Sequence, residues 1–134
     1  MLLGGTNSGA NLAMAKVAAE KKRVFISIGA ASARLTNEEC SPYTVHYAYD
    51  TIALARGTGG AIVKQGGKSW YFMTADYAFG QSLEKDTSEV VAANGGKVLG
   101  SVRHPFPGTD FSSFLLKAQS SGAKVIALAN ASGD

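Results

Sequence analysis

Cysteine and histidine are scarce in this chain, and their scarcity excludes several classes of protein. Cys40 is the single cysteine among 134 residues, which rules out an internal disulfide framework and a multi-cysteine metal site. The two histidines, His46 and His104, have no partners at the spacing of metal ligands or of a Cys–His catalytic pair. We therefore expect neither a metal nor a cofactor.

Long apolar runs and clustered charges are also missing. No stretch approaches the ~20 apolar residues that span a bilayer. The start, Met1-Leu2-Leu3, leads directly into Gly4-Gly5 without the basic and apolar regions of a secretory signal, which taken literally predicts a cytoplasmic location. The net charge of +3 comes from scattered lysines and arginines that are not interleaved with aromatic residues, so no nucleic-acid partner is expected.

A short glycine and lysine signature recurs in the second half of the chain. It occurs at Gly66-Gly67-Lys68, Gly95-Gly96-Lys97 and Gly122-Ala123-Lys124, and an apolar run follows each time. A glycine just after a helix can adopt the left-handed conformation that closes the helix. The apolar runs show little alternation, which is typical of strands covered on both faces. The signature therefore predicts consecutive βα units.

The same interpretation extends over the whole chain. The expected strands are residues 1–4, 24–28, 69–74, 98–102 and 125–129, and the expected helices are residues 11–20, 50–64, 79–94 and 110–121. Residues 29–49 are predicted to be a long connection, and the glycines of helix 50–64 indicate close packing. Right-handed crossovers then give an α/β fold, a parallel sheet of about five strands with helices on both faces in a flavodoxin-like three-layer sandwich. We expect residues 1–134 to form a single domain.

Ligands of such sheets bind beyond the carboxyl ends of the strands. The loops at those ends are residues 5–9, 29–34, 75–80, 104–109 and 130–134. In the first loop, backbone amides and the hydroxyls of Thr6 and Ser8 could face an anion at a positive helix end. The loop lacks the lysine of a nucleotide-binding P-loop. The alternative is a tight turn in which Asn7 or Ser8 is the helix N-cap.

Two further loops carry candidate ligand contacts. Gly29-Ala30-Ala31-Ser32 is small and polar, so its backbone could reach a carboxylate, although an ordinary βα turn would look the same. Tyr77 and Phe79 follow a predicted strand, where they could stack on an apolar ligand or only close the core. The chain has no nucleophile elbow and no other convincing catalytic motif, so we do not predict an enzyme.

Several segments resemble type I periplasmic solute-binding proteins of ABC transporters, the leucine/isoleucine/valine-binding class. Residues 69–83, with WYFMTADYAFG, are similar to the family's strand followed by D-Y-x-x-G. Residues 104–116, HPFPGTDFSSFLL, resemble its P-x-x-x-x-D-F-S-x-x-L segment, and residues 124–134 resemble the next strand with its ligand-side loop. GGTNSG and GAASARLT resemble two loops of the first lobe. Residues 47–80 look most similar to members that handle aromatic acids.

The resemblance implies binding of a small organic carboxylate, either an aromatic acid or a branched-chain amino acid. It also implies a periplasmic location and the membrane subunits of an ABC transporter as partners. By resemblance, Ser8 holds the ligand carboxylate, Ala30 and Ser32 contact the ligand, Tyr77 closes over it, and Asn130 lies on a loop facing the cleft. The candidate ligand-binding residues are Asn7, Ser8, Ala30, Ala31, Ser32, Tyr77, Phe79 and Asn130.

The resemblance also bears on the extent of the chain. Residues 1–65 resemble the end of the family's first lobe and residues 66–134 the start of its second, so the chain looks like an internal fragment or a truncated member. Uncovered sheet edges and apolar faces would then favour a homo-oligomer. A second hypothesis stays open, that of a non-transport structural or interaction protein that keeps the fold but has lost ligand binding.

Overall fold

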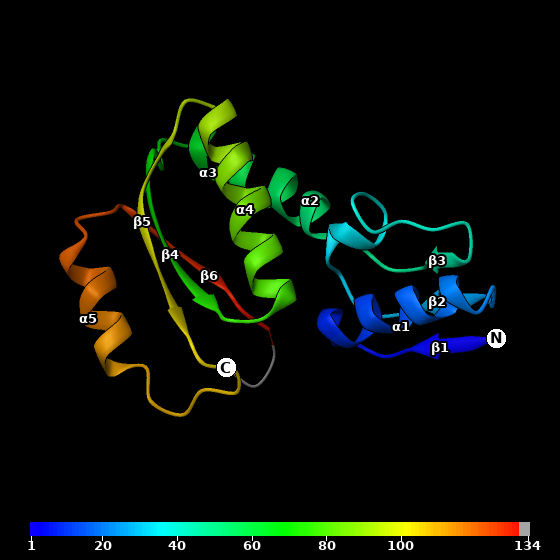
Figure 1. Cartoon of the computed structure of the whole chain (residues 1–134). Helices are drawn as coiled ribbons and strands as arrows, with labels where there is room; N and C mark the ends of the chain where they lie inside the picture. Colours follow the sequence, from blue (N-terminus) through cyan, green and yellow to red (C-terminus); the bar gives the residue numbers. More distant parts are fainter. Residues whose placement is uncertain (132–134) are drawn as a thin grey trace.

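The computed structural model describes residues 1–131, and its strands form two parallel sheets of three strands each (Figure 1). The first sheet has the order β1-β2-β3, with β1 at Leu2–Gly4, β2 at Phe25–Ser27 and β3 at Thr44–His46. The second has the order β5-β4-β6, with β4 at Ser69–Ala75, β5 at Lys97–His104 and β6 at Val125–Ala129. The predicted α/β class with parallel strands and flanking helices is confirmed. The prediction of one flavodoxin-like sheet of about five strands is wrong.

The pairing of the strands explains the second sheet. β4 pairs with β5 along one edge and with β6 along the other, so it has no free edge for β2. β3 pairs with β2, although β3 lies inside the segment that the sequence pattern predicts to be a connection. The pattern does not reveal β3 because a strand of three residues is too short to show a period. The helix that follows β3 carries the chain from one sheet to the other. The proposed division into residues 1–65 and 66–134, within one domain or as two lobes, stays a prediction.

Among the described residues, helices cover one face of the first sheet and both faces of the second (Figure 1). α1 (Ser8–Glu20) packs on the first sheet and buries Leu12, Ala15 and Ala18 against Phe25. α4 (Ala78–Ala93) and α5 (Ser112–Ser120) lie on opposite faces of the second sheet (Figure 1). A short 3-10 helix, η1 (Ala33–Leu35), lies in the loop between β2 and β3.

The helix predicted at residues 50–64 is observed as three consecutive segments. They are α2 (Thr51–Leu54), η2 (Ala55–Gly59), which has π-helical hydrogen bonding, and α3 (Gly60–Lys64). Asp50 caps the start, since its side chain accepts a hydrogen bond from the Ala53 amide. A Cβ at Gly59 would lie 3.3 Å from Cγ2 of Thr87 on α4. The glycine therefore permits close packing of the two helices, as the sequence predicts.

The recurrent glycines close the helices as expected. Gly66, Gly95 and Gly122 have φ angles of 99°, 80° and 68°, in the left-handed region that glycine tolerates best. After α4, the Gly96 amide donates a hydrogen bond of 2.8 Å to the Val91 carbonyl, which satisfies a free carbonyl of the last turn. This closure lets each strand begin within a few residues of the preceding helix.

α5 begins two residues later than the sequence predicts. The backbone amide of Ser112 donates a hydrogen bond of 2.9 Å to the carboxylate of Asp110. Hydrogen bonds from the Ser112 backbone and side chain lower the pKa of Asp110. Asp110 thus accepts a hydrogen bond from the first residue of the helix, as expected of a capping residue, although it lies just outside the helix.

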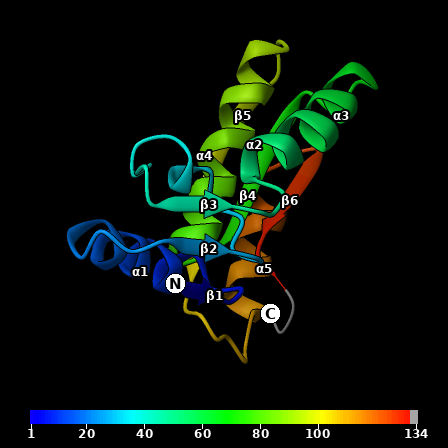
Figure 2. The same cartoon turned by 90° about the vertical axis from the view of Figure 1, so that its right-hand side faces the viewer.

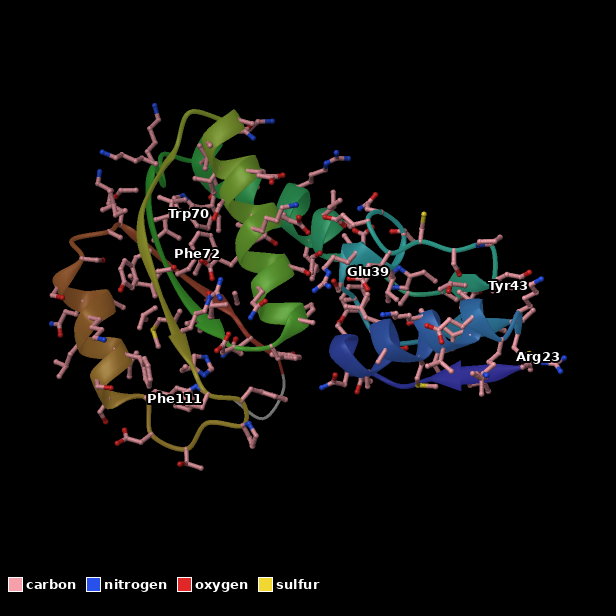
Figure 3. The ribbon with its side chains drawn as sticks, viewed as in Figure 1. Arg23, Glu39, Tyr43, Trp70, Phe72 and Phe111 are labelled. Atoms are coloured by element: carbon pink, nitrogen blue, oxygen red, sulfur yellow. The ribbon has the colours of Figure 1, made fainter. Side chains whose placement is uncertain are left out.

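The core of the second sheet is built around two aromatic side chains of β4. Trp70 and Phe72 pack against Val91 of α4 and Val63 of α3, and their rings lie 6.2 Å apart (Figure 3). The indole N–H of Trp70 donates a hydrogen bond of 2.7 Å to the Gly67 carbonyl. Trp70 therefore contributes both apolar burial and a satisfied polar group.

Replacing Trp70 with alanine is expected to lower the free energy of unfolding by about 3–5 kcal/mol, because it leaves a large cavity in the core. Urea denaturation followed by circular dichroism measures the change. The control is Leu116→Ala on α5, where the side chain is 66% exposed and the expected change is within about 0.5 kcal/mol. Equal effects of the two substitutions would contradict the assignment of Trp70 to the core.

Candidate functional site

A cavity of about 300 Å³ lies between the two sheets, beyond the carboxyl ends of the strands. The loops that follow β1 and β4 approach each other there (Figure 1). Every one of the six strands is followed by at least one residue of the cavity wall. The wall consists of Thr6, Asn7, Gly29, Ala31, Tyr49, Tyr77, Phe79, Phe106 and Ala131. This is the position expected for a ligand site of parallel α/β sheets.

Two helices begin at this cavity. Asn7 is the N-cap of α1, where its side-chain oxygen accepts a hydrogen bond of 3.0 Å from the Ala10 amide. Tyr77 occupies the N-cap position of α4. The N-terminus of a helix carries partial positive charge. None of the described residues of the wall has a charged side chain, so the positive charge that the wall itself offers comes from these two helix ends.

Aromatic rings form the wall contributed by the second sheet. Tyr77 stacks on Phe106 with a centroid distance of 4.3 Å and an interplanar angle of 11°. Phe79 lies 6.0 Å from Tyr77 in a tilted arrangement. Tyr49, which is 60% exposed, contributes a further ring from the first sheet's side. A flat apolar ligand would therefore meet aromatic surfaces from both sheets.

Behind the cavity, buried hydroxyl groups join the two halves of the chain. The hydroxyl of Ser8 at the start of α1 accepts a hydrogen bond of 3.2 Å from the Ser32 amide. The hydroxyl of Ser32 shares a hydrogen bond of 2.7 Å with that of Ser82 on α4. Ser8 and Ser32 are fully buried and Ser82 is 7% exposed. These bonds fix the first two loops against the helix of the second sheet.

A second buried link runs beside the first. The hydroxyl of Thr51 at the start of α2 donates a hydrogen bond of 2.5 Å to the carboxyl group of Asp86 on α4. The same hydroxyl accepts a hydrogen bond of 3.1 Å from the Ala33 amide. Thr51 is fully buried and Asp86 is 9% exposed. We refer to Ser8, Ser32, Ser82, Thr51 and Asp86 together as the junction.

The predicted ligand-binding residues divide between the cavity and the junction. Asn7, Ala31, Tyr77 and Phe79 line the cavity. Ser8 and Ser32 belong to the junction, while Ala30 is fully buried and its carbonyl lies 2.6 Å from Nε2 of His46. Asn130 is half-buried and next to Ala131 of the wall. Whether any of the eight contacts a ligand stays a prediction.

Tyr49 and Phe106 line the cavity, although the sequence pattern does not mark them as site residues. Phe106 lies in loop 104–109, which the sequence does place at a strand end. Tyr49 follows β3, the strand that the sequence pattern does not reveal, so no signal placed it at a carboxyl end. Thr6, whose hydroxyl is one of the two that could face an anion by the sequence, is part of the wall.

Each histidine contacts protein groups. Nε2 of His46 lies 2.6 Å from the Ala30 carbonyl. His104 is 2% exposed, and its ring meets those of Phe111 and Phe114 edge to face. Within residues 1–131, no group of three or more histidine, cysteine, aspartate or glutamate side chains is arranged to hold a metal ion. Over the same residues, no helix combines the length and apolar character required to cross a bilayer.

Larger hollows occur elsewhere on the surface. One of about 720 Å³ lies between the helix 51–64 and α4, and Arg56, Lys64 and Glu89 contribute to its rim. Another, of about 480 Å³, lies beside α4 near Lys85. Charged side chains contribute to the walls of both, together with small and apolar residues. We select the smaller cavity as the candidate site because the loops after all six strands converge on it.

Comparisons with known proteins agree with this arrangement. The sequence profile of the family described as periplasmic binding protein matches residues 1–134. The chain belongs to this family. A crystal structure of a periplasmic binding protein from Burkholderia mallei is 69% identical, with a TM-score of 0.97 over 99% of this chain and 36% of that one. The comparison with curated proteins gave no match.

More distant solved structures share the fold. A solute-binding protein of an ABC transporter from R. palustris, solved in complex with benzoate, is 26% identical, with a TM-score of 0.90 over 98% of this chain and 37% of that one. A leucine-binding protein from Thermotoga maritima, at 20% identity and a TM-score of 0.82, covers 94% of this chain and 36% of its own. This periplasmic binding protein chain thus spans about a third of the length of these structures.

Family membership confirms several sequence predictions. The recognition of an ABC-type solute-binding protein is correct, and the family consists of binding proteins and not of enzymes, as the missing catalytic motif suggests. Members of the family are periplasmic. Some related structures contain benzoate or 4-hydroxybenzoate, and another is of a leucine-binding protein.

The junction is testable with an isosteric substitution. Thr51→Val removes the hydroxyl and leaves the Asp86 carboxyl and the Ala33 amide without this partner, so the free energy of unfolding should fall by about 1–3 kcal/mol. Chemical denaturation followed by tryptophan fluorescence measures the change.

The matched control is Thr58→Val, an exposed position of the same helical stretch, where a change within about 0.5 kcal/mol is expected. If Thr51→Val were as mild as this control, the bond to Asp86 would not stabilise the junction.

Proposed function

We propose that the chain supplies part of the ligand-binding cleft of a solute-binding component of an ABC uptake transporter, and that the ligand is a small organic carboxylate. The two ligand classes that the sequence predicts are aromatic acids and branched-chain amino acids. The observation that carries the proposal is the convergence of the loops after all six strands on one cavity between the sheets. Its volume, about 300 Å³, lies at the small end of the range for ligand pockets and suits a ligand with one ring.

The two helix ends support a carboxylate as the charged group of the ligand. α1 and α4 have 13 and 16 residues, and their N-cap residues Asn7 and Tyr77 both belong to the wall. Partial positive charge and free amide donors at a helix N-terminus favour an anion. A carboxylate placed between Asn7 and Tyr77 would meet both helix ends at once.

The composition of the wall favours an aromatic acid over an amino acid. Tyr49, Tyr77, Phe79 and Phe106 present ring surfaces to the cavity. An amino acid also brings an ammonium group, and burial of that charge requires an anionic or polar partner. No acidic side chain occurs among the described residues of the wall. An uncharged aromatic body with one carboxylate therefore matches the cavity better.

The wider role concerns the whole receptor. By family membership, we propose that the assembled binding protein works in the periplasm and delivers its ligand to the membrane subunits of an ABC transporter. We also propose that the chain forms a homo-oligomer, because apolar residues such as Leu3, Leu116 and Leu128 are more than half exposed.

Ligand binding is expected to depend on Tyr77. Titration calorimetry with benzoate should show binding to the parent chain, and Tyr77→Ala should weaken it about two- to tenfold, because stacking of aromatic rings contributes on the order of 0.5–1.5 kcal/mol. Leucine serves as the competing amino-acid ligand and should bind more weakly than benzoate.

Tyr43→Ala is the matched control, since Tyr43 lies at the far end of the first sheet, away from the cavity (Figure 3). The control should bind benzoate like the parent. If neither benzoate nor leucine binds at millimolar concentration, the chain does not retain binding, and the non-transport hypothesis gains weight.

A further inference from the structure

One wall of the cavity is contributed by the loop that joins β5 to α5. We call residues 105–111 the Phe106 loop. It lies at the lower end of the molecule, beyond the carboxyl end of β5 (Figure 2). Phe106 lines the cavity and stacks on Tyr77, which follows β4, with 4.3 Å between the ring centroids. Because Phe106 is 38% exposed, its place in the wall depends on how the backbone of its loop is held.

The base of the Phe106 loop is fixed by the second sheet. His104, the last residue of β5, is the register partner of Ala75 on β4. The His104 carbonyl accepts a hydrogen bond of 2.9 Å from the Asp76 amide. Tyr77 and Phe106 each follow the pair of Ala75 and His104 by two residues. Their stacked rings therefore continue the pairing of β4 with β5 beyond the ends of both strands.

The imidazole of His104 holds the peptide group that leads into Phe106. Its Nδ1 lies 3.0 Å from the Pro105 carbonyl oxygen. A carbonyl only accepts hydrogen bonds, so this bond requires the proton on Nδ1. The proline ring fixes the φ angle of Pro105, which leaves its ψ angle as the remaining backbone freedom of that residue. Because the peptide unit is planar, a hydrogen bond to the Pro105 carbonyl sets ψ and, with it, the direction in which the chain enters Phe106.

The imidazole is itself held in one orientation. His104 is 2% exposed, and its ring meets those of Phe111 and Phe114 at centroid distances of 4.9 and 5.9 Å. The Phe106 loop also folds back closely on these groups. A Cβ at Gly108 would lie 2.7 Å from the Phe111 ring and 3.1 Å from the Pro105 carbonyl oxygen. All of these contacts are made between residues of the described chain.

We propose that His104 is a positioning residue of the ligand site. It is not among the described residues of the cavity wall, and it acts through Phe106. Its Nδ1–H holds the Pro105 carbonyl and thereby keeps the Phe106 ring stacked on Tyr77. The effect of His104 on ligand affinity rests on the proposed binding of an aromatic acid, whereas the placement of Phe106 does not. If His104 only filled the core, its replacement by a ring of similar size would change neither.

The parent chain offers the first test. In mildly alkaline buffer, long-range proton–nitrogen correlation spectra report which imidazole nitrogen carries the proton. We expect Nδ1–H at His104 and the opposite tautomer, Nε2–H, at His46, whose Nε2 lies 2.6 Å from the Ala30 carbonyl. A His46→Gln variant identifies which signal belongs to which residue. An Nε2–H tautomer at His104 would overturn the proposal.

Two substitutions separate the hydrogen bond from the packing. His104→Phe keeps an aromatic ring against Phe111 and removes Nδ1, whereas His104→Asn removes the ring and supplies an amide N–H for the same carbonyl. Without ligand, the ring-current shifts of the Tyr77 protons report the stacking of Tyr77 on Phe106. His104→Phe should move these shifts toward the values of Phe106→Ala, and His104→Asn should keep them closer to the parent. Circular dichroism establishes that each variant is folded.

The ligand test combines benzoate titration with a double-mutant cycle. His104→Phe should weaken benzoate binding about two- to tenfold, the range expected for the loss of one aromatic contact. In a Phe106→Ala background the same change should have no further effect, because His104 acts through Phe106. Val91→Ala is the control for lost core packing in the same sheet. Val91 is fully buried outside the cavity wall, so this variant should leave the dissociation constant unchanged.

Three further results would overturn the proposal. They are unchanged Tyr77 shifts in folded His104→Phe, equal displacement of these shifts by His104→Asn, and equal weakening of benzoate binding with and without Phe106. A parent chain that binds no benzoate would instead contradict the proposed ligand, and the Tyr77 shifts would still decide whether His104 positions Phe106. If His104→Phe does not fold, the tautomer in the parent chain decides.

Discussion

The relative position of the two sheets depends on the buried hydrogen bonds of the junction. Ser82 and Asp86 project from α4, the helix of the second sheet, and bond to Ser32 and Thr51, which lie in the loops and helix that leave the first sheet. A buried hydroxyl or carboxyl group is costly unless its hydrogen bonds are made. These bonds therefore strongly favour one arrangement of the two halves, and that arrangement sets the width of the cavity between them.

The cavity follows from this constraint and from the direction of the strands. In each parallel sheet all strands end at the same edge, and the junction holds these two edges toward each other. The loops after the strands then share one space, where the starts of α1 and α4 provide partial positive charge and the Tyr77–Phe106 pair provides an aromatic surface. The buried and the cavity-facing side chains have different roles. Buried polar groups hold the two sheets together, whereas side chains of the cavity wall are the ones proposed to contact a ligand.

The hydrogen bonds of the junction change the role that we assign to two candidate residues. Ser8 and Ser32 look from the sequence like ligand contacts at two small polar loops, and each lies beside a residue of the cavity wall. In the structure, the Ser8 hydroxyl binds the Ser32 amide, and the Ser32 hydroxyl binds Ser82. The resemblance to a family and the local pattern locate loops that border the cavity. They do not show which side chain of a loop turns toward the cavity and which turns toward the protein.

The sequence by itself determined the local features: the βα units, the three glycine closures at Gly66, Gly95 and Gly122, the cap at Asp50, and the family. Each of these depends on a few neighbouring residues, through backbone conformation or hydrophobic period. Only the tertiary structure decided that the strands form two sheets, that Tyr49 joins the cavity, and that Thr51 bonds to Asp86. Two strands pair, and two side chains 35 residues apart bond, only where a strand edge or a buried polar group still lacks a hydrogen-bond partner. Which edges and groups lack a partner is decided by the assembled fold and not by any local pattern.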